Sequence, residues 1–168
     1  MRDQARVQLA GRTEKKPIHE MVLPVRAGEG LTRLPAPSKG DIFLDLEGDP
    51  FVGDGGREYL FGVVTLGARK KIEYREFWAF TPAEERRAFE QLIDLIMAAW
   101  EKDPGAHVYH FGGYEPGAMK RLMGRYATRE NEVDRLLRGE RFVNLLTMVK
   151  QSLRASVESY SIKKLEEF

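Results

Sequence analysis

The amino-acid sequence predicts an α/β fold in which a mixed β-sheet is flanked by helices. Two observations lead to this fold class. First, an apolar strand pattern at 42–47 precedes two strand-like segments, 57–66 and 70–80, whose short connection Gly-Ala-Arg-Lys indicates an antiparallel hairpin. Second, segments with helical periodicity then alternate with short apolar strands, an order typical of parallel strands covered by helices.

The segment at 42–47 begins with three apolar residues in a row, which is typical of a central strand covered on both faces. After the hairpin, residues 81–105 have the pattern of a long amphipathic helix. Thr81 can cap this helix, and Glu84 has the spacing of a capping box. The side chains expected to be buried are Phe89, Leu92, Ile93, Ile96, Met97 and Trp100.

A second core strand is expected at 106–111, and shorter elements follow it. Periodicity and capping residues predict a helix at 116–126, a helix at 128–139 capped by Thr128, a short strand from 141 that continues as a helix to 153, and a helix at 159–168 capped by Ser159 or Ser161. The later strands supply the parallel part of the mixed sheet.

The chain is expected to have one main domain with a short preceding segment. Residues 1–25, a charged helical stretch and a second apolar patch, have no core of their own, and we expect them to end an upstream domain. Residues 26–40 are rich in glycine and proline and are expected to form a linker. Residues 41–168 make the main domain, which we expect to be incomplete at its C-terminus.

Composition narrows the class of protein. With 42% hydrophobic and 32% charged residues, the 168-residue chain is in the range of ordinary globular proteins. The net charge of +1 means that any nucleic acid would have to bind through a local patch. The absence of cysteine excludes disulfides and thiolate zinc sites. No apolar run is long enough to span a bilayer and no secretory signal is evident, so we expect a cytoplasmic protein.

Two acidic residues at the end of the first core strand are the strongest candidates for chemistry. Asp45 and Glu47 are two positions apart, so a strand places both side chains on one face. Two adjacent carboxylates repel each other unless a cation lies between them, and Mg²⁺ binds a few carboxylates together with water and phosphate oxygens. The alternative is solvated surface charge, because other acidic pairs with this spacing occur in the chain.

Glu115 is the third candidate. It follows the strand at 106–111 and precedes Pro116, so it is expected where the chain changes from strand to helix. Ligands of α/β proteins gather at such strand ends. The alternative is a glutamate that interacts with the helix dipole.

Other residues have weaker indications. His107 and His110 are three apart on a strand and face opposite ways, so they form no chelate, although His110 could donate near the site or be structural. The helix after Glu115 carries basic residues that could contact a nucleic-acid backbone, or could simply be solvated. The candidate nucleic-acid contacts are His110, Tyr114, Lys120, Arg121 and Arg125. Trp78 and Trp100 are expected in the core.

A resemblance to a known family rests on these segments. The first motif, D-x-E, of the DEDD (DnaQ-type) 3′–5′ exonucleases resembles IFLDLEGDP, and their second motif resembles YHFGGYEPGAMKRL. The segment that precedes the third motif in the YprB-like branch is similar to RFVNLLTMVKQ and SYSIKKLEEF. These exonucleases share the RNase H-like fold. The resemblance therefore implies an RNase H-like mixed sheet flanked by helices.

The chain most resembles the central domain of bacterial multidomain proteins that join a predicted RecB-family nuclease, an RNase H-like domain and a superfamily 1 helicase. Residues 1–25 would then end the upstream nuclease domain. The resemblance places Asp45 and Glu47 in the first motif and Glu115 in the second, where the family usually has aspartate. The aspartate of the third motif has no counterpart before Phe168.

The implied function is hydrolysis of nucleic-acid phosphodiesters with two Mg²⁺ or Mn²⁺ ions, in the manner of a 3′–5′ exonuclease within a DNA-repair nuclease–helicase. Asp45, Glu47 and Glu115 would be both catalytic residues and metal ligands. The expected partners are a single-stranded DNA or RNA end and the adjacent nuclease and helicase domains. Residues 1–168 alone are expected to bind metal weakly and to cut poorly.

Two other functions are consistent with the residues. A degenerate RNase H-like module would bind nucleic acid or act as a scaffold without catalysis. An aspartyl-nucleophile phosphatase has a motif similar to FLDLEG, but it requires aspartate where Glu47 stands, and no antiparallel hairpin follows its motif.

Overall fold

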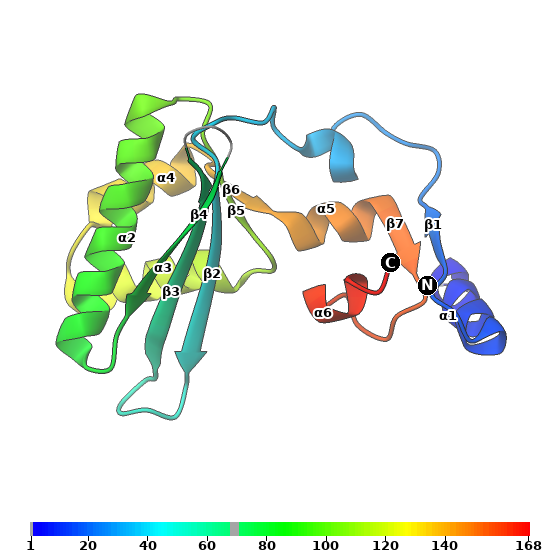
Figure 1. Cartoon of the computed structure of the whole chain (residues 1–168), viewed down its shortest axis with the longest axis horizontal. Helices are drawn as coiled ribbons and strands as arrows, with labels where there is room; N and C mark the ends of the chain where they lie inside the picture. The colour runs from blue at the N-terminus through cyan, green and yellow to red at the C-terminus, as the bar shows by residue number, and fades with distance from the viewer. Residues whose placement is uncertain (1, 68–70) are drawn as a thin grey trace. The chain divides into compact units, whose positions relative to one another are not determined.

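The computed structural model describes residues 2–67 and 71–168, which form two compact units (Figure 1). One unit comprises residues 35–144. The other combines residues 1–34 with residues 145–168. Within the described part of the chain, every helix is too short or too polar to cross a membrane.

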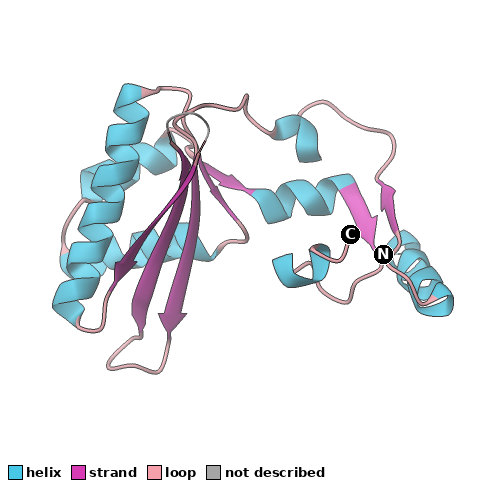
Figure 2. Cartoon of the chain, in the orientation of Figure 1, coloured by secondary structure: helices cyan, strands magenta, loops and turns pink. Residues whose placement is uncertain are grey.

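The unit of residues 35–144 contains a five-stranded mixed sheet (Figure 2). The strand order is β4-β3-β2-β5-β6, with β2 (Ile42–Asp49) in the centre. Strands β3 (Arg57–Leu66) and β4 (Ile72–Trp78) run antiparallel, whereas β5 (Val108–His110) and β6 (Phe142–Asn144) run parallel to β2. The predicted mixed sheet and hairpin are confirmed, although 68–70 of the predicted turn lie outside the described residues.

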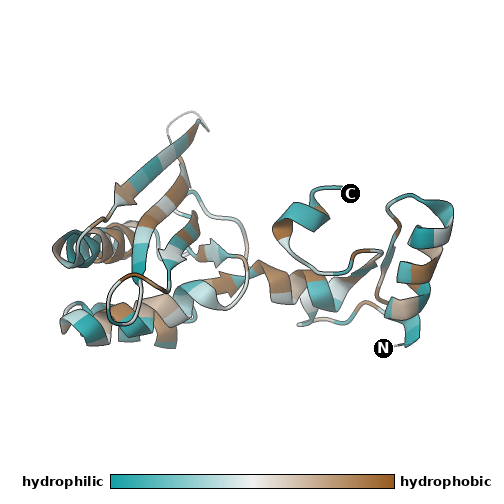
Figure 3. Cartoon of the chain, turned by 90° about the horizontal axis from the view of Figure 1, so that it is seen from below, coloured by the Kyte–Doolittle hydropathy of each residue, from teal (hydrophilic) through white to brown (hydrophobic). Residues whose placement is uncertain are grey.

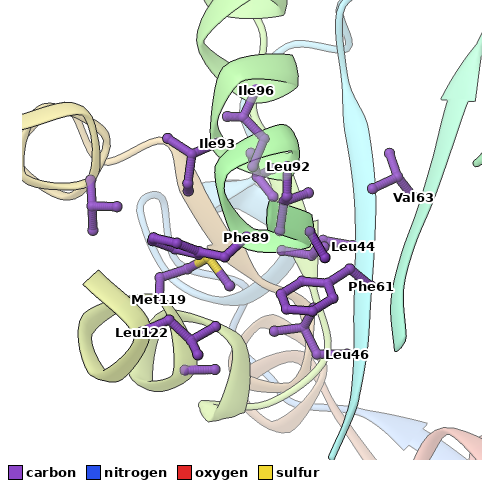
Figure 4. Packing of buried hydrophobic residues seen from close by; sticks show 14 of the residues in the cluster. Leu44, Leu46, Phe61, Val63, Phe89, Leu92, Ile93, Ile96, Met119 and Leu122 are labelled. Atoms are coloured by element: carbon purple, nitrogen blue, oxygen red, sulfur yellow. The ribbon is translucent and has the colours of Figure 1, made fainter. Parts of the chain in front are cut away.

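Three helices cover one face of this sheet: α2 (Pro82–Lys102), α3 (Tyr114–Tyr126) and α4 (Glu130–Arg138). Thr81 and Glu84 form the predicted capping box at the start of α2. The apolar stripe of α2 is part of one buried cluster with inner side chains of β2 and β3 (Leu44, Leu46, Phe61 and Val63) and of α3 (Met119 and Leu122), as Figure 4 shows. Burial of these side chains supplies the main stabilisation of this unit.

The second face of the sheet is open to solvent at β2 and at edge strand β4, whereas all three residues of β5 are buried. Buried and exposed residues alternate along β2, and the side chain of Phe43 is 50% exposed. Figure 3 shows hydrophilic and hydrophobic residues interleaved along the strands. The expectation that β2 is covered on both faces is therefore wrong, because α2, α3 and α4 all pack on the same side. Trp78 was expected in the core but is 47% exposed, whereas Trp100 packs against the core.

The turn between β2 and β3 agrees with the sequence, whereas the side chain of Ser161 makes no capping hydrogen bond at the start of the last helix and the predicted cap of α4 is wrong. Asp49 accepts a hydrogen bond from the Phe51 amide, 2.8 Å away, in the glycine-rich turn that joins β2 to β3. Thr128 does not cap α4, because its hydroxyl donates to Glu90 and the N-cap position is Arg129.

The other unit is built from both ends of the described chain. Its N-terminal elements are α1 (Arg2–Glu14), β1 (His19–Met21) and the 3₁₀ helix η1 (Gly30–Arg33). Its C-terminal elements are α5 (Leu145–Ser152), β7 (Leu153–Ala155) and α6 (Ile162–Leu165), which Ser161 precedes.

Strands β1 and β7 pair antiparallel in this unit. This pairing was not predicted, because each strand has only three residues. The proposed division of the chain into 1–25, 26–40 and 41–168 remains a prediction.

Candidate metal and nucleic-acid site

Asp45 and Glu47 lie side by side on the solvent-exposed face of the central strand. Both side chains are exposed, while the residues between and before them point into the core. In the antiparallel register, Asp45 is opposite Gly62 and Glu47 is opposite Leu60 of β3. Within the described residues, no cationic side chain forms an ion pair with either carboxylate. The prediction that they share one face is confirmed.

Glu115 comes to the same region from the neighbouring strand. Strand β5 pairs parallel with β2 and ends at His110, and α3 begins at Tyr114. Glu115 is therefore in the first turn of α3, at the predicted change from strand to helix. Its side chain is buried, with the residue only 3% exposed, and Oε2 lies 3.1 Å from Nδ1 of His110.

The three carboxylates interact electrostatically. The pKa of Asp45 is raised above its ordinary value, first because partial burial disfavours the charged form and then because Glu47 and Glu115 add negative charge. This influence shows that Glu115 lies within electrostatic reach of Asp45. The arrangement concentrates negative charge that a cation would neutralise.

The donor set fits a hard divalent cation that retains water. Mg²⁺ is usually held by one or two carboxylates plus phosphate oxygens rather than by a full protein cage. Asp45 and Glu47 provide two exposed carboxylates of this kind. Among the described residues, no three acidic, histidine or cysteine side chains are grouped to hold one ion together. Glu115, paired with His110, is within the electrostatic reach of Asp45 but is not grouped with the other two carboxylates.

The basic residues of α3 have partners within the same unit. The guanidinium of Arg121 forms an ion pair with Glu58. Arg125 pairs with Glu85 at 3.0 Å and also donates to two carbonyls of the glycine-rich turn. Lys120 is exposed on the same helix. A role in nucleic-acid binding remains a prediction for all three.

Two buried glutamates of this region were not singled out from the sequence. Glu58 and Glu85 are 2% and 1% exposed. Nothing around either residue in the sequence indicates burial. The one available signal is the four-residue spacing of Arg121 and Arg125, which places both on one face of α3 and so favours acidic partners on neighbouring elements.

Exposed aromatic rings lie on the same face as the carboxylates. Cross-strand pairing places Glu47, Leu60 and Trp78 in one row across β2, β3 and β4. The Trp78 ring is stacked with Tyr59 at 6.5 Å and with Phe80 at 5.8 Å between ring centroids. These rings form a short aromatic ladder (Tyr59, Trp78 and Phe80) over β3 and the end of edge strand β4.

Further aromatic residues border Asp45. Phe43 is stacked on Tyr109 of β5 with 5.2 Å between ring centroids. Tyr74 extends over Gly62, where an added Cβ would lie 3.2 Å from the tyrosine hydroxyl. Since Gly62 is paired with Asp45, the absence of a side chain leaves room for Tyr74 beside the carboxylate.

The carboxylates are outside the groove between α2 and the sheet. This groove has a volume of about 870 Å³, and its lining includes Thr65 and Leu95. Asp45, Glu47 and Glu115 do not line it. Asp45 and Glu47 are instead exposed on the face of β2, and Glu115 is buried beside His110.

The sheet of order β4-β3-β2-β5-β6, with helices packed on one face and two exposed carboxylates on its central strand, defines a mixed α/β domain. A family model described as the RNase H superfamily matches residues 42–168. The chain belongs to the RNase H superfamily, whose domains process nucleic acids and whose nucleases generally use divalent metal ions. No curated protein and no solved structure matches the chain.

Proposed function

We propose that this domain hydrolyses phosphodiester bonds of nucleic acids with divalent cations, as a 3′–5′ exonuclease of the DEDD type. The observation that carries the proposal is the pair of exposed carboxylates on β2, joined electrostatically to Glu115. The parent protein would be a larger DNA-processing protein with nuclease and helicase domains. The resemblance of the sequence motifs to that group supports this context.

Each residue has a distinct part in the proposed reaction. Asp45 and Glu47 would hold Mg²⁺ or Mn²⁺, which when bound polarises the phosphate and lowers the pKa of a water molecule. Their exposure leaves the remaining ligand positions open to phosphate oxygens and water. Glu115 adds negative charge close to Asp45 and is kept in place by His110.

The aromatic ladder supports single-stranded nucleic acid as the substrate. Unpaired bases stack on exposed rings whatever their sequence, whereas the bases of a duplex are already stacked on one another. Trp78 presents such a ring in the same row of the sheet as Glu47, and the exposed ring of Phe80 stacks on it. A single strand of nucleic acid that lies across β4 would thus bring its phosphates towards Asp45 and Glu47.

Replacing Trp78 by alanine is expected to weaken binding of a single-stranded oligonucleotide by about 5- to 150-fold, because a base stacked on an aromatic ring contributes roughly 1–3 kcal/mol. Fluorescence anisotropy with Ca²⁺ in place of Mg²⁺ measures this affinity. The control is Ile72→Ala at the far end of β4, where affinity should stay the same. Unchanged affinity of Trp78→Ala would contradict the proposed base contact.

The catalytic proposal is tested with a 5′-labelled single-stranded oligonucleotide. For residues 1–168 we expect slow shortening from the 3′ end in Mg²⁺ or Mn²⁺ and none in EDTA. The protein should also bind Mn²⁺ saturably. This binding is measured by the loss of the electron paramagnetic resonance signal of free Mn²⁺. Absence of both metal binding and cleavage would overturn the proposal.

A second candidate function is a non-catalytic module that binds nucleic acid. The pairing of buried Glu115 with His110, and the absence of a three-ligand group among the described residues, favour it. Such a module would bind single strands in EDTA as tightly as in Mg²⁺, with affinity that falls as salt rises. The nuclease proposal predicts instead that divalent cations strengthen binding.

A further inference from the structure

Glu58 reaches the buried face of the sheet because of an irregularity in strand pairing. Glu47 is opposite Leu60, but the next residue, Gly48, is opposite Glu58, so Tyr59 is an extra residue in β3. Such a bulge reverses the faces to which the following side chains point. Without it, Glu58 would share the exposed face with Leu60. With it, Glu58 points towards the helices and is almost fully buried.

At this position the Glu58 carboxylate binds two side chains of α3. The Tyr114 hydroxyl donates to it, with oxygen–oxygen distances of 3.0 and 2.9 Å, and Arg121 forms an ion pair with it. Hydrogen bonds to an ionised carboxylate are among the stronger ones in proteins, particularly where water is excluded. The two contacts, seven residues apart on α3, therefore fix the position of the first turns of this helix.

The neighbours of these residues are the proposed metal ligands. Gly48 directly follows Glu47, and Tyr114 directly precedes Glu115. An added Cβ at Gly48 would lie 2.6 Å from the Tyr114 hydroxyl and would also collide with the Glu58 carboxylate. Strand β2 and helix α3 thus meet around the Glu58 carboxylate. The residues that meet there, Gly48 and Tyr114, are next in sequence to Glu47 and Glu115.

Glu58 is itself held in place from the opposite side. Its backbone N–H donates to Oε1 of Glu85, 2.5 Å away in α2. Glu85 in turn pairs with Arg125 and Tyr126 of α3. The buried glutamates therefore connect α2, β3 and α3 into one braced unit.

We propose that Glu58 is a positioning residue that sets the location of Glu115 relative to Glu47, acting through Tyr114 and Arg121. This inference rests on the proposed nuclease function. Glu58 itself touches neither metal nor substrate. Its effect arises because displacement of a site residue by about 1 Å can cost on the order of 100-fold in rate.

Two variants test this role. Glu58→Gln removes the charge of the side chain but keeps its size. Tyr114→Phe removes one oxygen from a half-exposed ring and should leave the fold intact. In each, kcat for cleavage should fall by about 10- to 100-fold, as for residues that orient metal ligands. In Glu58→Gln, KM for the oligonucleotide should change by less than about twofold, because Glu58 itself does not touch the substrate.

A second readout needs neither metal nor activity. The ring signals of His110 in the NMR spectrum of the metal-free protein report the place of Glu115, since the two side chains are hydrogen-bonded. We expect these signals to shift in Glu58→Gln and in Tyr114→Phe. The matched control is Glu90→Gln, a partly buried α2 glutamate bonded to Thr128, which should leave both kcat and the His110 signals unchanged.

The two proposals fail in different ways. If Glu58→Gln and Tyr114→Phe keep the wild-type kcat and the wild-type His110 signals, Glu58 is only structural and the inference is overturned. If the wild-type protein neither binds Mn²⁺ nor cuts, the proposed function fails, and the His110 signals alone still decide whether Glu58 positions Glu115.

Discussion

Asp45→Asn should lower the rate of metal-dependent cleavage by at least about 100-fold. Asparagine has the size of aspartate but no charge. Asp45 is also the carboxylate whose pKa is raised by the negative charge of both Glu47 and Glu115. Loss of residues that merely orient a metal ligand typically costs 10–100-fold, so loss of a ligand should cost more. Single-turnover cleavage of a single-stranded oligonucleotide, with Mn²⁺ affinity measured in parallel, provides the comparison.

The matched control is Asp49→Asn at the end of the same strand. Asp49 serves the turn by accepting the Phe51 amide, and the asparagine oxygen can accept the same bond. We expect this variant to cut and to bind Mn²⁺ like the wild type. Cleavage by Asp45→Asn at the rate of Asp49→Asn would show that the carboxylates of β2 do not form the catalytic site.

Glu85→Ala should lower the free energy of unfolding by about 3–5 kcal/mol, the typical cost of removing one partner of a buried ion pair. The change removes the carboxylate that pairs with the Arg125 guanidinium, and it leaves the backbone N–H of Glu58 without its acceptor. Urea unfolding followed by circular dichroism measures the difference. The control, Glu101→Ala on the exposed side of the same helix, should change stability by less than about 0.5 kcal/mol.

The ionisation of Tyr126 reports the same contact. Burial, together with the hydrogen bond to Glu85, raises the pKa of Tyr126 from 10.0 to about 12. Because the folded-state pKa exceeds the unfolded one, the associated stability is fully present below pH 10 and is lost as the pH rises towards 12. In Glu85→Ala, ultraviolet titration should show the pKa of this tyrosine falling towards its ordinary value. An unaltered titration would contradict the assigned contact.

Local patterns were enough to predict much of the fold. The capping box at Thr81 and the apolar stripe of α2 depend on residues close together in the chain, and both are present. The shared face of Asp45 and Glu47 follows from the strand period alone. These features need no knowledge of distant neighbours.

Features that depend on distant partners could not be predicted. The burial of Glu58 results from a one-residue shift in strand pairing, which leaves no mark in local sequence. Trp78 looks like a core residue by type, yet it is on edge strand β4, on the face that the three helices leave open. The pairing of β1 with β7 joins two strands too short to be recognised by alternation.

The interlocking of the two chain ends has a consequence for the order of folding. Gln4 donates its side-chain amide to the carbonyl of Ala155, 151 positions further on, and Tyr160 donates its hydroxyl to Gln4. During synthesis, residues 1–34 are therefore made long before their partners in residues 145–168, while the unit of residues 35–144 has all its contacts available earlier. The sheet that carries the carboxylates should fold first, and residues 1–34 should remain open to chaperones and proteases until residues 145–168 have been made.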